Sequence, residues 1–404
     1  MRELLRKWAE SSLILRILCG LVIGAALGLV VPQWTGIGIL GQVFVGALKA
    51  IAPILVAVLV MSSIARAKGG LGPRFRTVII LYLLTTFVAA LVAVSGSFLF
   101  PVTIKLEGGE AGNLPGGLAD IFSSLLNNMV ANPVLSLTTA NYMGILFWSV
   151  IIGVAARLTR SQTVINFFGE LSDVVSLAVK WIIQFAPFGI LGLVFTSVSE
   201  GGLGIFSDYG RLVLLLVGCM LVTSLIVNPI LAFIFLRKNP YPLLWQCLKE
   251  SGLSAFFTRS SAANIPMNLA LCKKLGLDEE FYSVSIPLGS TINMDGAAVT
   301  ITVLTLAVAN TLGMEVSFGS ALLLSVMATL GACGASGVAG GSLLLVPMAC
   351  SLYGIPQDIA MQAVAVGFII SVVQDSVETA LNSSGDAFFT AVAELHERRR
   401  GRGC

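Results

Sequence analysis

The chain has few charged residues, a single histidine and no paired cysteines. Only 11% of its 404 residues are charged, whereas soluble proteins carry about 25%, so a soluble globular domain is excluded. The one histidine, His396, lies near the end of the sequence, which excludes histidine-based metal or proton-relay chemistry inside the apolar segments. The seven cysteines form no C-x-x-C pair and are odd in number, so neither a disulfide framework nor a thiolate metal site is expected.

The chain is rich in long apolar runs. Hydrophobic residues make up 56% of the chain, and membrane-length stretches lie at 13–31, 41–64, 77–102, 134–157, 170–198, 209–236, 281–312 and 357–392. The first is about 19 residues long, so it predicts a transmembrane helix rather than a cleaved signal peptide, whose apolar core is about 7 to 15 residues. We expect an all-α polytopic membrane protein with eight transmembrane helices.

Two further apolar regions, 244–271 and 318–350, are interrupted midway by small polar residues. The first break contains Arg259 to Asn264, and the second is the glycine-rich stretch 331–337. Non-helical backbone at membrane depth is tolerated only where it is buried in protein or lines a cavity. Both regions are therefore predicted to be re-entrant helical hairpins whose tips meet inside the protein.

The loop charges indicate the orientation. With eight crossings and two hairpins, most lysines and arginines lie on the side of the basic N-terminus, whereas the opposite side receives only Lys105 and Arg211. The positive-inside rule then places both termini in the cytoplasm. The net charge of +3 reflects this topology, and no nucleic-acid partner is expected.

The second half of the chain repeats one pattern, a hairpin followed by a helix with a polar cluster. The hairpin 244–271 precedes the cluster Asn293–Gly296, and the hairpin 318–350 precedes a cluster on 357–392. The first hairpin would enter from the cytoplasm and the second from outside, so the two units are inverted. Inverted repeats with broken helices and a site near the midplane are typical of secondary transporters.

Carboxylates lie inside two of the predicted spans. Asp295 interrupts 281–312, and a charge at the bilayer centre costs roughly 3 kcal/mol or more, so Asp295 is a candidate functional residue. The last span carries five polar residues spaced to share one helical stripe, namely Asp375, Glu378, Thr379, Asn382 and Asp386. Because the span is largely apolar outside this stripe, the stripe predicts a protein-lined polar cavity rather than a solvated face.

In this order, the motifs resemble the dicarboxylate/amino acid:cation symporter family, the bacterial relatives of glutamate transporters. The matching residues are Thr258–Ser261, Pro287–Gly289, Thr291–Gly296, the glycine-rich second hairpin, Asp375, Thr379 and Asn382 to Asp386. The resemblance covers essentially the whole chain and is strongest to members that couple sodium to serine and threonine. It implies a glutamate-transporter-like fold, a homotrimer and a lipid-embedded location in a bacterial inner membrane.

The resemblance also implies a division into scaffold and transport parts. The first two helices (1–76) would belong to the scaffold and the third (77–102) to the mobile transport domain. Residues 103–240 would be rich in scaffold helices, 241–392 would form the transport core of both hairpins and the two polar helices, and 393–404 would be a basic cytoplasmic tail.

Three sodium sites and no other cofactor are implied by the resemblance. The first would use Gly289, Asn293, Asn382 and Asp386; the second Thr291, Met294, Thr329, Leu330 and Ala332; the third Tyr82, Thr85, Thr86, Asn293 and Asp295. Oxygen-only ligation suits a hard cation such as sodium. Helix packing through hydroxyl residues is the alternative role for the stretch 82–86, and protons are an alternative coupling ion.

For the substrate, the resemblance assigns Asp375 to an α-ammonium and Asn382 to an α-carboxylate. The remaining expected contacts are Thr379 and the two hairpin tips, with Ser260, Ser261, Ala335, Ser336 and Gly337. Where members with acidic substrates carry an arginine, this chain has Glu378. A substrate carboxylate about 4 Å from Glu378 would suffer roughly 4 kcal/mol of repulsion at an effective dielectric near 20, so a small neutral amino acid, serine or threonine, is expected.

Several alternatives remain at this point. Glu378 could pair with Arg259, which the family's geometry also brings close to Asp375. A C4-dicarboxylate or acidic amino acid symporter is the alternative within the family. An intramembrane aspartyl protease would need Tyr-Asp and Gly-x-Gly-Asp motifs, which do not occur around Asp295 and Asp386, so no enzyme is expected; a passive channel would need a continuous polar path rather than two hairpins.

Overall fold

The computed structural model describes residues 13–66, 73–106, 129–139, 141–202, 205–333 and 340–401, and every regular element among them is helical. The elements are α2 (Leu13–Val30), η1 (Thr35–Ile37), α3 (Gly38–Arg66), α4 (Pro73–Leu99), α6 (Pro133–Thr138), α7 (Tyr142–Leu158), α8 (Gln162–Gln184), α9 (Ala186–Gly201), α10 (Ile205–Val222), η3 (Thr223–Val227), α11 (Asn228–Leu236), α12 (Tyr241–Cys247), η4 (Leu248–Gly252), α13 (Leu253–Thr258), α14 (Ile265–Lys274), α15 (Glu279–Ile292), α16 (Asp295–Thr311), α17 (Phe318–Ala332), η5 (Leu343–Leu345), α18 (Val346–Ser351) and α19 (Gln357–Arg399).

Five helices or continuous helix runs in the described residues are long and apolar enough to cross a membrane. They are the runs that contain α3, α4, α10–α11, α15–α16 and α19, and the bent pair α8–α9 makes a sixth if it counts as one span. The apolar helices α2 and α7 are shorter than that length. The prediction of an all-α polytopic membrane protein is confirmed.

Two predicted spans differ from straight helices. The stretch 170–198 contains parts of α8 and α9, which meet at Phe185 with a bend of 51°. Pro187 lies in the first turn of α9 and has no N–H to continue the hydrogen bonds of α8. The stretch 134–157 is divided into α6 and α7, and the side chain of Asn141 caps the start of α7 by accepting the N–H of Gly144 at 3.3 Å.

Both interrupted regions fold as helix, break and helix. In the first, α13 ends where Arg259 adopts the left-handed conformation (φ 51°), and the chain returns in α14, which packs against η4. In the second, α17 ends at Ala332, residues 334–339 lie outside the described part, and the chain continues from Gly340 into η5 and α18. The helix α18 packs against α17.

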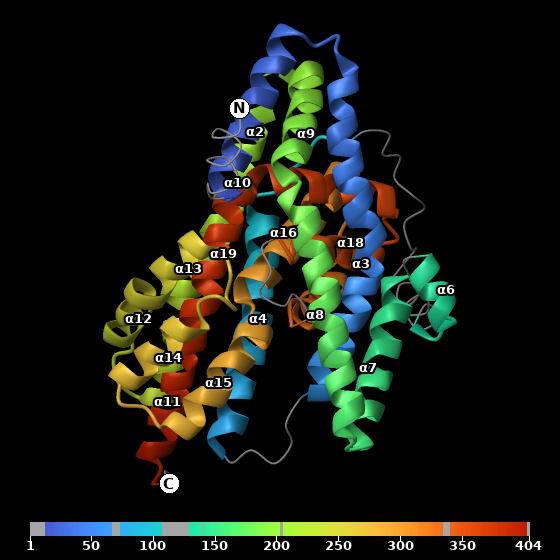
Figure 1. The fold of residues 1–404 in the computed structure, drawn as a ribbon. Coiled ribbons are helices and arrows are strands. Elements are labelled where there is room, and N and C mark those ends of the chain that lie inside the picture. Colours follow the sequence, from blue (N-terminus) through green and yellow to red (C-terminus); the bar gives the residue numbers. More distant parts are fainter. Residues whose placement is uncertain are drawn as a thin grey trace, which may run out of the picture.

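The helices form two packed groups (Figure 1). The helices α2, α3, α7, α8 and α9 contact mainly one another, whereas α4, α10, α11 and α12 to α19 pack together, with α19 in contact with most of them. Figure 1 shows α19 running alongside α13, α14 and α15, away from α7 and α8. The helices α10 and α11, which fall in the stretch predicted to be rich in scaffold helices, pack with α4 and α19.

Glycines allow α2 to lie directly on the backbone of α9. A Cβ added at Gly20 would be 2.2 Å from the carbonyl oxygen of Pro187, and one at Gly24 would be 2.5 Å from that of Leu191. Gly28 continues the same four-residue spacing and is also close to α9. Small residues at this spacing let membrane helices approach to backbone contact.

The helices α16 and α19 form the interior of the second group. Every residue of α16 from Asp295 to Ala309 is buried, so this helix is surrounded by protein rather than lipid. Helix α19 continues past 392 to Arg399, and Glu394 and Glu397 near its end are 0% and 1% exposed. Residues 393 to 399 therefore continue the helix, with Leu395, Arg398 and Arg399 exposed, where the sequence predicts a basic tail from 393 onward.

Candidate functional site

The helical run that carries Asp295 is broken in the middle of its buried length. Asn293 (φ −95°, ψ 80°) and Met294 (φ −121°, ψ 51°) leave the helical conformation, so α15 ends there and α16 begins at Asp295. Asn382 of α19 stabilises the new helix start, because its Oδ1 accepts the N–H of Gly296 at 2.8 Å. The sequence predicts one full helix over this stretch; instead, the break brings non-helical backbone to the side of α19.

Asn293 joins three elements at this break. Its Nδ2 donates to Oδ1 of Asp386 at 3.0 Å and to the carbonyl oxygen of Asn382 at 3.2 Å. Its Oδ1 accepts the hydroxyl of Thr85 at 3.4 Å. All four residues are buried, so one amide connects α4, the α15–α16 break and α19.

Asp295 is fully buried, and its hydrogen-bond partners in the described part of the chain are neutral. The hydroxyl of Thr86 donates to its Oδ1 at 3.0 Å, and Nδ2 of Asn228 donates to its Oδ2 at 3.2 Å. Asn228 begins α11 and is not among the predicted site residues. Its position before Pro229 is visible in the sequence, but nothing there indicates which helix it faces.

Tyr82 takes part through its backbone rather than its phenol. Its hydroxyl lies 2.9 Å from Oγ1 of Thr390 and 3.2 Å from the carbonyl oxygen of Asp386, so it binds α19. Its carbonyl oxygen lies 3.1 and 2.8 Å from the hydroxyl oxygens of Thr85 and Thr86, as an alternative acceptor for the single protons that these hydroxyls can also donate to Asn293 and Asp295. The structure therefore brings the carbonyl oxygen of Tyr82 next to the two threonines.

Asp386 is the second buried carboxylate of this cluster. Its Oδ1 accepts from Asn293, whereas its Oδ2 is buried without a hydrogen-bond partner in the described residues. A Cβ at Gly289 would lie 2.9 Å from that Oδ1 and 2.8 Å from the phenol oxygen of Tyr82, so a side chain at this position would displace at least one of these two groups. A buried carboxylate oxygen without a donor is costly unless a cation or a proton neutralises it. The oxygen-rich surroundings fit a hard cation such as sodium.

Arg259 at the tip of the first hairpin pairs with Asp375 of α19. Its Nε and Nη2 both lie 2.7 Å from Oδ2 of Asp375, and the two side chains are only 6% and 3% exposed. The other carboxylate oxygen, Oδ1, accepts the N–H of Gly340 at 3.4 Å, where the second hairpin returns. Asp375 therefore contacts both hairpins at once.

Glu378 lies one turn further along α19 and is held by three donors. Its Oε2 accepts the hydroxyl of Thr300 at 2.7 Å and that of Ser342 at 2.9 Å, together with the amide of Gln374. These donors come from α16, the second hairpin and α19. The sequence leaves open whether Glu378 pairs with Arg259; in the structure, the carboxylate partner of Arg259 is Asp375.

Two predicted threonines bond to their own helices. The hydroxyl of Thr379 donates to the carbonyl oxygen of Asp375 at 2.7 Å, and that of Thr291 donates to the carbonyl oxygen of Leu288 at 2.7 Å. Thr379 still lies on the same stripe of α19 as Asp375. Its hydroxyl oxygen keeps acceptor capacity while it donates.

The hairpin residues differ in burial. Ser261 is buried at the first tip, and the Oγ of its neighbour Ser260 accepts the N–H of Ala263 at 3.2 Å. Thr329 and Ala332 are buried near the end of α17, whereas the Leu330 side chain is 55% exposed, so Leu330 offers only its backbone to an interior site. The predicted residues Ala335, Ser336 and Gly337 lie outside the described residues.

The first hairpin is fixed to α19 by an amide and serine cluster that sequence reasoning missed. The Oγ of Ser383 accepts Nδ2 of Asn264 at 2.8 Å and Nδ2 of Asn268 at 3.1 Å. Asn264 also donates to the carbonyl oxygen of Ser251 at 3.2 Å, and all four residues are buried. A serine beside the polar stripe of α19 is visible in the sequence, but its two amide partners are not.

Comparison with known proteins shows the family to which this chain belongs. A family model described as the sodium:dicarboxylate symporter family matches residues 13–395. The chain belongs to this family. A serine/threonine transporter SstT of Streptococcus agalactiae serotype Ia is 57% identical over 396 residues, which cover 98% of both chains. The proteins of the same name from Streptococcus thermophilus and Bifidobacterium adolescentis are 56% and 57% identical, over 98% and 96% of this chain and 98% and 90% of their own lengths.

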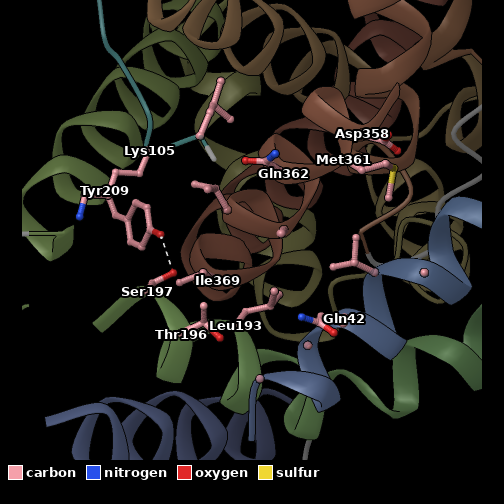
Figure 2. A pocket seen from close by; sticks show the side chains of 17 residues that line it. Gln42, Lys105, Leu193, Thr196, Ser197, Tyr209, Asp358, Met361, Gln362 and Ile369 are labelled. Atoms are coloured by element: carbon pink, nitrogen blue, oxygen red, sulfur yellow. Dashed lines mark hydrogen bonds between the residues drawn. The ribbon is translucent and has the colours of Figure 1, made fainter. Parts of the chain in front are cut away.

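The protein also contains a cavity of about 640 Å³ between α3, α9 and the first turns of α19. Figure 2 shows Gln42 of α3 and Ser197 of α9 on one side of it and Gln362 of α19 on the other. Lys105 and Asp358 add opposite charges at its edges. Over this stretch, a partly polar space separates the two helix groups.

Proposed function

We propose that this chain is a sodium-coupled secondary active symporter that imports small neutral amino acids, chiefly L-serine and L-threonine, by alternating access. The family and the names of its relatives support this proposal. The observation that carries it is the arrangement on α19. About three helical turns hold Asp375 and Glu378 at one end and Asp386 at the other, with Asn382 between them in contact with both sides of the helix break.

Sodium would bind among the buried oxygens around the helix break. The first site would use the backbone near Gly289, Asn293 and Asn382 with Oδ2 of Asp386, which has no hydrogen-bond partner among the described residues. The second would use the backbone at Thr291, Met294, Thr329, Leu330 and Ala332. The third would use the Tyr82 carbonyl oxygen, Thr85, Thr86, Asn293 and Asp295. A bound sodium ion would balance the negative charges of Asp386 and Asp295, whose hydrogen-bond partners among the described residues are neutral. The side chains present here hold their oxygens in place for it.

The amino acid would bind beside the second turn of the stripe. Oδ1 of Asp375 would accept the α-ammonium while Arg259 continues to hold Oδ2. The Nδ2 of Asn382 would donate to the α-carboxylate, because its present partner is the weakly accepting sulfur of Met294 at 3.4 Å. Substrate and cation would then share Asn382, since its carbonyl oxygen also accepts from Asn293.

Glu378 supports a neutral substrate over the dicarboxylate alternative. A second substrate carboxylate about 4 Å away would suffer roughly 4 kcal/mol of repulsion, and Arg259 is already paired with Asp375. A serine or threonine hydroxyl could instead donate to Glu378. The runner-up, a symporter of C4-dicarboxylates or acidic amino acids, is favoured only by the family's description.

We further propose the complete architecture of eight transmembrane helices and two inverted hairpins, assembled as a homotrimer in the bacterial inner membrane with both termini in the cytoplasm. The group of α2, α3 and α7 to α9 would form the scaffold, and the group that contains α4, α16 and α19 would move against it. The partly polar cavity between α3, α9 and α19 supports this division, because an open gap resists sliding less than close packing does.

A competition assay distinguishes neutral amino acids from dicarboxylates and acidic amino acids as substrates. Purified protein in proteoliposomes would take up labelled serine under an inward sodium gradient, with unlabelled threonine, alanine, aspartate or succinate added in parallel. We expect threonine to inhibit serine uptake at concentrations where aspartate and succinate do not. If succinate or aspartate inhibits uptake as well as threonine does, the protein is instead a symporter of C4-dicarboxylates or acidic amino acids.

A further inference from the structure

Asn228 belongs to none of the sodium sites proposed above, yet it lies against one of their carboxylates. It is 2% exposed, and its Nδ2 donates to Oδ2 of Asp295 at 3.2 Å. Its own Oδ1 is buried without a hydrogen-bond partner among the described residues. A buried acceptor without a donor is unfavourable, so a ligand that donates to it or coordinates it would stabilise this position.

Local structure aims this side chain inward. The five-residue π-helical turn η3 ends directly before Asn228, and the Asn228 N–H donates to the carbonyl oxygen of Thr223 across that turn. Pro229 comes next, and it has no N–H to give to the preceding turn. A π turn inserts one residue into a helix and rotates the residues after it, and such turns are frequent at functional sites.

We propose that Asn228 is a further ligand of the deep cation site formed by Thr86 and Asp295. Without a cation, its Nδ2 holds one oxygen of Asp295. When sodium binds, a half rotation of the amide exchanges Nδ2 and Oδ1, and the amide oxygen joins the carboxylate and the Thr86 hydroxyl oxygen around the ion. Oxygen ligands of this kind suit a hard cation. The inference rests on the proposed sodium coupling.

The test measures cation binding without transport. Thermal unfolding of the purified protein in detergent would be followed against sodium concentration, with choline keeping the ionic strength constant. Asn228→Ala should raise the sodium concentration for half-maximal stabilisation about tenfold, which corresponds to about 1.4 kcal/mol. Asn228→Asp should restore a strong response to sodium, because it returns an oxygen to the same position. Asn310→Ala is the matched control, since Asn310 bonds to Val102 at the far end of α16.

The outcomes separate this inference from the function it rests on. If sodium does not stabilise the wild-type protein, the proposed coupling ion is wrong. If sodium stabilises wild type and Asn228→Ala at the same concentration, the coupling ion stands and Asn228 is not a ligand. Should Asn228→Ala fail to fold, a sodium response of Asn228→Asp much weaker than that of Asn310→Ala would also overturn the inference.

A different observation concerns the outer face of α4 and α10. A groove of about 890 Å³ lies between these helices, lined almost entirely by apolar side chains, with Arg211 as its charged member. Leu99 and Leu214 in its walls are each 74% exposed. Gly218 leaves part of it open, because a Cβ there would meet nothing within 4 Å. A groove on membrane-spanning helices with one cation fits an apolar chain that carries an anionic group.

We infer that this groove holds one phospholipid, with an acyl chain between α4 and α10 and its phosphate on Arg211. Arginine presents paired donors that match phosphate oxygens. Filling the groove with Gly218→Leu should remove one tightly retained phospholipid per chain, whereas Gly210→Leu should not, because Gly210 is on the same helix, has open space and does not line the groove. Arg211→Gln should abolish any preference for phosphatidylglycerol over phosphatidylcholine.

Native mass spectrometry of the protein released from mixed phosphatidylglycerol and phosphatidylcholine nanodiscs counts the retained lipids. One lipid fewer in Gly218→Leu than in wild type and Gly210→Leu supports the site. Equal numbers in all three proteins would overturn it, and an unchanged lipid preference in Arg211→Gln would overturn the role of the arginine.

Discussion

The Asn293 amide lies 3.0 Å from a carboxylate oxygen of Asp386, which ties the break between α15 and α16 to α19. Both side chains are fully buried, and the same amide reaches the backbone of Asn382. A cation that changes the position of Asn293 or Asp386 therefore acts on the residue proposed to hold the substrate carboxylate. Because coupling between two ligands is reciprocal, loss of cation affinity should appear as loss of substrate affinity.

Asp386→Asn tests this connection. The change removes the negative charge that would attract sodium while it keeps an acceptor for Asn293. We expect the sodium concentration for half-maximal serine uptake to rise at least about tenfold, or about 1.4 kcal/mol, and the apparent serine affinity to fall at subsaturating sodium. A variant with wild-type sodium dependence would show that this carboxylate is structural.

Gly289→Ala tests the same site by volume rather than charge. The new methyl group would lie within 3 Å of Asp386 and Tyr82, so it should displace the carboxylate and weaken the sodium-dependent thermal shift. Gly46→Ala is the matched control, because a methyl group there meets nothing within 4 Å. Equal sodium responses of the two variants would argue against a cation at Gly289.

Glu378 is the residue on which substrate selectivity depends. In Glu378→Arg, threonine should no longer inhibit serine uptake. The comparison variant is Glu378→Gln, which keeps an oxygen for Thr300 and Ser342 but removes the negative charge. We expect aspartate to compete with serine in Glu378→Gln more strongly than in wild type, because the repulsion of roughly 4 kcal/mol is removed. Unchanged aspartate competition would place Glu378 away from the substrate side chain.

Ser383→Ala should loosen the first hairpin. It removes the hydroxyl acceptor that the amides of Asn264 and Asn268 share. Because Asn264 still donates to Ser251 and Asn268 to the backbone carbonyl oxygen of residue 383, each lost hydrogen bond should cost about 0.5–1.5 kcal/mol. Ser384→Ala is the control, because Ser384 bonds to backbone carbonyl groups of its own helix. The unfolding temperature in detergent should be lower for Ser383→Ala, and equal unfolding temperatures would show that the cluster does not hold the hairpin.

Much of the site could be predicted because membrane segments tolerate polar residues only for a reason. The cost of burying charge in lipid identifies Asp295 and the stripe from Asp375 to Asp386, and the small polar neighbours of Arg259 identify the break there. The glycines at 20, 24 and 28 are equally visible by their spacing, but their partner helix is not.

Contacts between distant segments account for the features that the sequence could not predict. Asn228, which meets Asp295, directly follows a π turn, and periodicity carries no signal for such a turn. The three donors to Glu378 come from separate elements. The bend at Phe185 depends on Pro187, which is visible in the sequence, although a proline alone does not fix whether a span bends or ends.

A sodium gradient is expected to drive serine accumulation. One sodium ion entering down 100 mV supplies about 2.3 kcal/mol, and a tenfold gradient adds about 1.4 kcal/mol, enough for accumulation of several hundredfold. The direct measurement is labelled serine uptake into proteoliposomes with sodium or choline outside and the same membrane potential. We expect serine accumulation well above equilibrium with sodium outside and none with choline; equal uptake in the two media would contradict sodium coupling.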